Sequence, residues 1–211
     1  MGSVIEKAVA HLESTKTRYE IIVINDGSTD GTSGVLAASA ARYPEVRVLT
    51  HERNHGYGRT LGELYRLAKM DVLISLHGDD QLPIGNLEVM LPGLTRHDLV
   101  VGRRRPRRDP WHRRLMSWLY NRSLRLLFGL RVSDVNSSKL IRREVLAAMT
   151  LISESPFVDA ELCLRAARGG FRVGEVDVEH HPRQFGRHSW TWWPTLQGTV
   201  HDVLSFRRAS T

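Results

Sequence analysis

The sequence predicts a single α/β domain built on a mostly parallel sheet flanked by helices, and three observations support this prediction. Short apolar runs alternate with segments whose apolar residues recur at helical spacing. The runs 21–24 and 72–76 resemble strands that are buried on both faces, and carboxylates follow each of them. At 211 residues the chain is long enough for one sizeable core, and no linker-like segment divides it.

The first half of the chain alternates predicted helices and strands. Val4, Ile5, Ala8, Val9 and Leu12 recur at helical spacing and predict the first helix. A glycine-rich turn at 56–58 then precedes a helix, as such turns often do. In order, the predicted elements after the first helix are strand 20–25, helix 31–42, strand 46–50, helix 59–68, strand 71–76, helix 86–94 and strand 98–102.

The pattern changes after residue 102. A basic loop, 103–108, contains Pro106 and leads into a long helical stretch at 111–130. A polar segment follows, and then predicted helices at 144–149 and 159–168 and a strand at 171–178. The tail from His180 onward is rich in Arg, His and Trp. These elements continue the same domain, because no change in composition marks a boundary.

Composition narrows the classes of function. Hydrophobic residues make up 41% and charged residues 25%, which is ordinary for a soluble globular protein. The single cysteine, Cys163, excludes an internal disulfide, and its apolar helical surroundings indicate a core position rather than a nucleophile. A net charge of +7 and a pI near 10.1 favour phosphate-bearing partners, namely nucleic acid, an anionic membrane or phosphorylated small molecules. No apolar run approaches the roughly 20 residues of a membrane span, and the N-terminus is not a signal peptide.

The first acidic strand end is Asn25-Asp26-Gly27-Ser28. In an open α/β sheet the carboxyl ends of the strands border the ligand crevice. A carboxylate there can accept hydrogen bonds from the N–H edge of a uracil or guanine, and Gly27 lets the backbone turn closely. The alternative is that Asp26 or Asp30 only caps the helix that follows.

The second acidic strand end is His77-Gly78-Asp79-Asp80-Gln81. A nucleotide diphosphate leaves readily only when its charge is neutralised, and Mg²⁺ or Mn²⁺ held by carboxylate and amide oxygens does this. Asp79 and Gln81 offer such oxygens, while the imidazole of His77 suits Mn²⁺ better than Mg²⁺. His77 is therefore a metal ligand, a sugar contact or neither. The alternative for the whole segment is a solvated acidic turn before Pro83.

Taken together, these motifs resemble those of the inverting family 2 glycosyltransferases with the GT-A fold, above all the dolichyl- and polyprenyl-phosphate sugar synthases. The order and spacing of the motifs carry the resemblance over roughly residues 4–206. Further motifs in the family's order are Asn54-His55-Gly56-Tyr57-Gly58, 134–139, 157–162, 170–173, and Arg183 with Gly186 and Ser189. The chain departs from the pattern at His77, and it lacks the usual first strand with its Pro-x-Tyr-Asn-Glu-like end.

The resemblance implies a role for each matching residue. It implies a nucleotide-sugar half over about 1–102 and an acceptor half over about 103–211. Nucleotide binding falls to Asn25, Asp26, Gly27 and Arg53, and the metal to Asp79, Gln81 and His77. Acceptor or phosphate binding falls to Arg104, Arg131, Ser137, Arg183 and Ser189. Asp159 and Asp79 are the implied catalytic residues, with Asp159 as the base for a hydroxyl acceptor; a phosphate acceptor is already an anion and needs no base.

The expected function is transfer of a sugar from GDP-mannose or a UDP-hexose to a polyprenyl phosphate with inversion. Two alternatives stay open: a soluble hydroxyl acceptor, or a degenerate binder of nucleotide sugars without turnover. Basic helices with aromatic residues, such as 111–130, can lie in a membrane interface, or they can face the core and expose a basic side. The first alternative predicts a cytoplasmic protein that contacts the membrane's cytoplasmic face. Nucleic acid is disfavoured, because the run 103–108 lacks interleaved aromatic residues and any familiar nucleic-acid motif.

Overall fold

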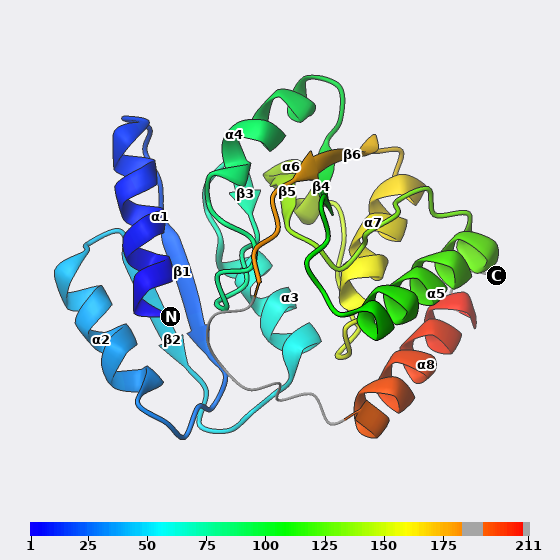
Figure 1. Cartoon of the computed structure of the whole chain (residues 1–211), viewed down its shortest axis with the longest axis horizontal. Coiled ribbons are helices and arrows are strands. Elements are labelled where there is room, and N and C mark those ends of the chain that lie inside the picture. The colour runs from blue at the N-terminus through cyan, green and yellow to red at the C-terminus, as the bar shows by residue number, and fades with distance from the viewer. Residues whose placement is uncertain (183–191, 209–211) are drawn as a thin grey trace.

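In the computed structural model, which describes residues 1–182 and 192–208, six strands form two separate sheets flanked by helices (Figure 1). The α/β class is confirmed. The strands are β1 (Ile21–Asn25), β2 (Val46–Thr50), β3 (Val72–Ile74), β4 (Leu99–Arg104), β5 (Lys139–Arg142) and β6 (Val173–Val178). The helices are α1 (Gly2–Ser14), α2 (Thr32–Arg42), α3 (Tyr57–Leu67), α4 (Asn86–Met90), the 3-10 helix η1 (Leu91–Thr95), α5 (Trp111–Phe128), α6 (Arg143–Ala147), α7 (Val158–Arg168) and α8 (Trp192–Arg208).

The smaller sheet pairs β1 with β2 in parallel, so that Asn25 and Thr50 lie side by side at its carboxyl end. Helices α1 and α2 contact each other and pack on this sheet through a small core. Four buried residues form that core: Ile5, Val9, Leu36 and Val46. The predicted α/β alternation of the first 50 residues is therefore correct.

The larger sheet has the strand order β3-β5-β4-β6. β5 runs antiparallel to both of its neighbours, whereas β4 and β6 are parallel. The expectation of a mostly parallel sheet is thus met only in part, since two of the four strand pairs are antiparallel. The difference arises from β5, which lies in the polar segment before residue 144 where no strand was predicted.

The two sheets are divided between β1 and β3. In the described part of the chain β1 pairs only with β2, and β3 pairs only with β5, so each keeps one edge without a partner strand. The half-buried side chains of both strands agree with this, because a central strand of one continuous sheet is usually fully buried.

Helix α7 lies at the centre of the main core. Eight of its residues are buried, and they pack against α3, α5, α6 and the larger sheet. Cys163 is fully buried in this helix, and burial raises the pKa of its thiol to about 12, as expected for a core residue. Helix α5 ends where Gly129 takes a left-handed conformation with φ of 70°. Among the described residues no helix is long and apolar enough to cross a membrane.

Candidate active site

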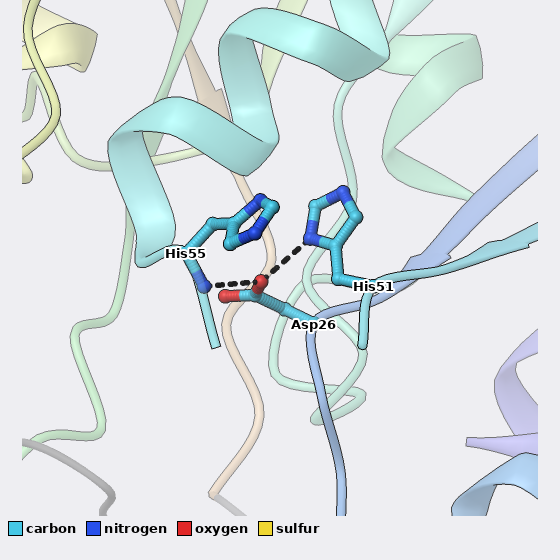
Figure 2. A group of neighbouring side chains, drawn as sticks. All are labelled: Asp26, His51 and His55. Atoms are coloured by element: carbon cyan, nitrogen blue, oxygen red, sulfur yellow. Dashed lines mark hydrogen bonds and ion pairs between the residues drawn. The ribbon is translucent and has the colours of Figure 1, made fainter. Parts of the chain in front are cut away.

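The carboxylate of Asp26, at the carboxyl end of β1, is hydrogen-bonded to the loop 51–56 between β2 and α3 (Figure 2). His51 Nδ1 lies 2.7 Å from Asp26 Oδ1, and the backbone N–H of His55 donates to the same oxygen at 2.8 Å. The N–H of Gly56 donates to Oδ2 at 3.0 Å. Asp26 therefore fixes the turn before α3 and does not cap α2. Asp30 accepts the N–H of Thr32, the first residue of α2, at 2.9 Å, although the N-cap position itself is Gly31.

Ligand-type atoms of Asp26, His51 and His55 lie within 4.8 Å of one another, which is close enough to share a metal ion. The observed contacts favour a hydrogen-bond network instead. Both Asp26 oxygens already accept N–H groups, and the two imidazole rings are stacked, with centroids 4.3 Å apart. His51 Nε2 also lies 3.0 Å from Glu63 Oε2, so His51 links two carboxylates.

Opposing effects set the pKa values in this network. The hydrogen bond to Asp26 raises the pKa of His51 above its usual value, removal from water opposes this, and Glu63 adds to the rise. Burial acts to raise the pKa of Asp26, but the hydrogen bonds from His51, His55 and Gly56 lower it overall. Both shifts favour the charged pair.

This network predicts a pH-dependent contribution to stability. The share from His51 is fully present below about pH 6.5 and decreases as the pH rises through its raised pKa. The share from Asp26 is present above about pH 4 and is lost as the pH falls through its lowered pKa. We expect His51→Phe to lower the free energy of unfolding by about 1.5–3 kcal/mol near pH 6 and by less at pH 9. Denaturant unfolding at pH values from 6 to 9 measures this free energy, and the variant His201→Phe, at an exposed histidine, is the control. An equal loss of unfolding free energy at pH 6 and pH 9 contradicts the prediction.

The other predicted nucleotide residues shape the same loop. Asn25 is buried, donates its amide to Ser33 Oγ at 2.8 Å and accepts the Ser28 N–H at 3.1 Å. Gly27 has φ of 69°, and a Cβ there would overlap the backbone of Arg53, so only glycine allows this close approach. The exposed Arg53 thus lies beside the Asp26 turn.

The predicted metal ligands lie in one segment after β3. The N–H of Gln81 donates to Asp79 Oδ1 at 3.2 Å, and the Gln81 side chain lies 3.4 Å from His180 Nε2. His77 is partly buried, and removal from water lowers its pKa although the carboxylates of Asp159 and Asp79 act to raise it. A neutral imidazole, a carboxylate and an amide within five residues form a donor set that fits Mn²⁺ or Mg²⁺.

Asp159 joins this segment through a chain of contacts. Tyr57 donates its O–H to Asp159 Oδ2 at 2.9 Å and lies 3.4 Å from His77 Nε2. The other oxygen of Asp159 forms an ion pair with Lys139, whose Nζ also donates to the backbone oxygen of Ser137 at 3.0 Å. Desolvation and the Asp159 carboxylate raise the pKa of Tyr57 well above its usual value. Tyr57 therefore links Asp159 to His77, and the Asp79 carboxylate lies near enough to act on the pKa of His77.

Tyr57 and Lys139 are functional candidates that sequence reasoning did not single out. Lys139 has a side chain only 1% exposed, in a strand between two others. The sequence feature that could have identified Lys139 is its place beside the apolar residues Leu140 and Ile141, in a chain with only four lysines. A buried ammonium needs a carboxylate partner, and Asp159 supplies it.

The predicted acceptor residues separate into different places. Arg104 holds Asp134 with two hydrogen bonds of 2.6 and 2.7 Å, so this guanidinium is already engaged inside the protein. Arg131 is exposed beyond the end of α5. Ser137 is buried beside Lys139, and its hydroxyl has no hydrogen-bond partner among the described residues. Arg183 and Ser189 lie outside the described residues.

Two sets of polar residues thus follow β1 and β3, at the strand ends where open α/β sheets bind their ligands. The sequence model of glycosyl transferase family 2 matches residues 2–150, which is more than half of the chain. The chain belongs to this family, and it is a glycosyltransferase. An uncharacterized glycosyltransferase of Mycobacterium tuberculosis is 29% identical over 205 residues, covering 95% of this chain and 90% of that protein.

Two other relatives have names that specify a lipid phosphate. A dodecaprenyl-phosphate galacturonate synthase of Rhizobium johnstonii is 28% identical over 97% of this chain and 62% of its own length. An undecaprenyl-phosphate 4-deoxy-4-formamido-L-arabinose transferase of Aeromonas hydrophila is 29% identical, over 88% of this chain and 57% of its own length. The chain therefore spans about 60% of the length of these two relatives.

Among solved structures, glucosyl-3-phosphoglycerate synthase of Mycobacterium tuberculosis superposes with a TM-score of 0.68 at 18% identity, covering 97% of this chain and 75% of that one. That structure holds Mn²⁺, uridine diphosphate and glucosyl-3-phosphoglycerate. At this identity the likeness establishes the fold, which is that of the GT-A glycosyltransferases.

Proposed function

We propose that this glycosyltransferase transfers a sugar from a nucleotide sugar to a polyprenyl phosphate, with inversion at the anomeric carbon. The donor is a UDP-hexose or GDP-mannose. The relatives named for undecaprenyl and dodecaprenyl phosphate support the acceptor class. The solved structures with Mn²⁺ and UDP support a metal-assisted nucleotide donor.

In this proposal the donor lies across the two strand ends. The loop of Asn25, Asp26 and Gly27, with Arg53 beside it, holds the nucleoside. Asp79 and Gln81, with neutral His77, would hold Mg²⁺ or Mn²⁺, which neutralises the diphosphate leaving group. Single displacement requires the acceptor to approach the anomeric carbon from the opposite side.

The engagement of Asp159 is the observation that carries the choice of acceptor. A hydroxyl acceptor needs a base to remove its proton, whereas a phosphate acceptor is already anionic. One oxygen of Asp159 is paired with buried Lys139, and the other accepts from Tyr57. Protonating Asp159 would leave the Lys139 ammonium buried without its partner, which is costly. Asp159 in this arrangement orients its neighbours, and the acceptor that suits it is a phosphate.

The exposed apolar side chains of α5 and α8 support a lipid acceptor. α8 meets α5 where the Phe128 and Phe206 rings lie 5.7 Å apart. The exposed apolar residues are Trp111, Leu115, Met116, Trp118, Leu119, Leu126 and Leu127 on α5, and Leu196, Val200 and Leu204 on α8. Arginines 113, 114, 122 and 125 on α5 complement anionic headgroups. We therefore place the enzyme peripherally at the cytoplasmic membrane face.

Replacing Trp118 and Leu119 by serine tests this contact. We expect the double variant to sediment with anionic liposomes at least about tenfold less than the unmodified protein, because two large apolar side chains leave the interface. Serine at exposed Val89 and Leu91, on α4 and η1, is the matched control and should leave the sedimentation with liposomes unchanged. An unmodified protein that never sediments would instead favour a soluble acceptor.

A donor panel followed by a transfer assay tests the function itself. The melting temperature is measured with UDP- and GDP-sugars, each with and without Mn²⁺. Sugars of one base only should raise the melting temperature, and the rise should be larger when Mn²⁺ is present. Radiolabelled sugar should then pass to polyprenyl phosphate. Transfer to a small hydroxyl acceptor instead, the reaction class that the glucosyl-3-phosphoglycerate synthase structures suggest, would replace the lipid proposal. Nucleotide binding without any transfer would indicate a degenerate binder.

A further inference from the structure

The segment 77–81, here called the metal turn, is held by helix α1. Lys7 of α1 forms an ion pair with Asp80 Oδ2. The side chain of Asp80 is only 7% exposed, whereas that of Lys7 is 57% exposed. Among the described residues, Lys7 makes the one side-chain hydrogen bond and ion pair of this buried carboxylate. Replacing Lys7 by an uncharged residue would therefore leave a buried charge without its partner.

The backbone at Asp80 is also constrained. Its φ of 59° lies in the left-handed region that residues other than glycine rarely adopt. Such a conformation persists only where the surroundings hold it. Met1, the residue just before α1, contacts the same turn, because its side chain occupies the space where a Cβ on Gly78 would lie. A third contact joins His11 of α1 to Glu88 of α4, with 3.8 Å between His11 Nε2 and Glu88 Oε1.

We propose that α1 sets the conformation of the metal turn, with Lys7 as the positioning residue. Asp80 stands between Asp79 and Gln81, so a backbone that rotates to bring an unpaired Asp80 carboxylate into water displaces both of these donors. Lys7 itself touches no ligand in this arrangement. The inference rests on the proposed function in one respect, the assignment of Asp79 and Gln81 to a divalent metal.

Lys7→Met is expected to weaken Mn²⁺ binding at least about tenfold, the range seen when residues that orient metal ligands are lost. Lys7→Arg keeps the charge and should stay within roughly threefold of the unmodified protein. Lys16→Met removes an equal charge just after α1 and is the matched control. Calorimetric titration with Mn²⁺ in the presence of the nucleotide diphosphate measures all four proteins.

The double variant Lys7→Met/Asp80→Gly gives the sharper result. Glycine adopts the left-handed conformation without strain and leaves no carboxylate to neutralise. Mn²⁺ affinity should therefore return to within about threefold of the unmodified protein, although Lys7 is still absent. Unchanged affinity in Lys7→Met, or no recovery in the double variant, overturns the proposal.

Hydrogen exchange of the amides in 77–81 separates this inference from the proposed function. If the unmodified protein binds no Mn²⁺, the proposed metal site is wrong, but the role of α1 is still tested. Faster exchange of these amides in Lys7→Met, reversed in the double variant, supports the positioning role. Exchange that is the same in all variants overturns it.

Discussion

Asp79→Ala is expected to abolish metal-dependent nucleotide binding and to lower sugar transfer by at least about a thousandfold. The carboxylate is the strongest oxygen donor in the metal turn, and without it the Mn²⁺ or Mg²⁺ that neutralises the diphosphate is not held. A loss of this size corresponds to about 4 kcal/mol of transition-state stabilisation. Titration with Mn²⁺ and a transfer assay measure the two effects separately.

Asp71→Ala is the matched control, because Asp71 is an exposed carboxylate just before the opposite end of β3. It should change neither metal affinity nor transfer. Metal-dependent binding that survives in Asp79→Ala would move the metal away from this turn, and the cluster of Asp26, His51 and His55 would then be the next candidate.

Lys139→Met should have the largest effect on stability. It leaves the Asp159 carboxylate buried without its ammonium partner, and breaking such a pair costs about 3–5 kcal/mol of unfolding free energy. The double variant Lys139→Met/Asp159→Leu replaces both charges by apolar groups and should recover most of the loss. Urea unfolding of both variants provides the comparison.

The exposed Lys69→Met variant should leave the free energy of unfolding unchanged. The double variant Lys139→Met/Asp159→Leu also tests function, because it lacks the Asp159 carboxylate. If Asp159 only orients Tyr57 and Lys139, transfer to a phosphate acceptor falls but persists. A complete loss of transfer in a well-folded double variant would restore Asp159 as a general base and favour a hydroxyl acceptor.

The acidic strand ends could be predicted because they are local features. An apolar run that ends before Asn25 or before His77 places the following carboxylates at the edge of a sheet, whatever the rest of the chain does. Strand β5 was missed because it is only four residues long and begins with Lys139. Its place between β3 and β4 depends on pairing with strands at least 35 residues away, which no local pattern records.

The partners of the arginines were beyond prediction for a similar reason. The run 103–108 looks like a free basic patch in the sequence, but its charges meet carboxylates from distant segments. Arg103 pairs with Asp177, Arg104 with Asp134, and Arg107 with nearby Asp109. Sequence reasoning could count these charges but could not tell that the fold neutralises several of them.

The division between the two sheets has a mechanical consequence. The unit of α1, β1, α2 and β2 has a small core of its own, and within residues 1–182 and 192–208 it shares no strand pair with the larger sheet. A two-stranded sheet with a small core is marginally stable by itself, so this unit should open at a lower free energy than the body around α7. A nucleotide bound across β1 and β3 would then hold this unit against the body around α7, and its release would allow the two to move apart.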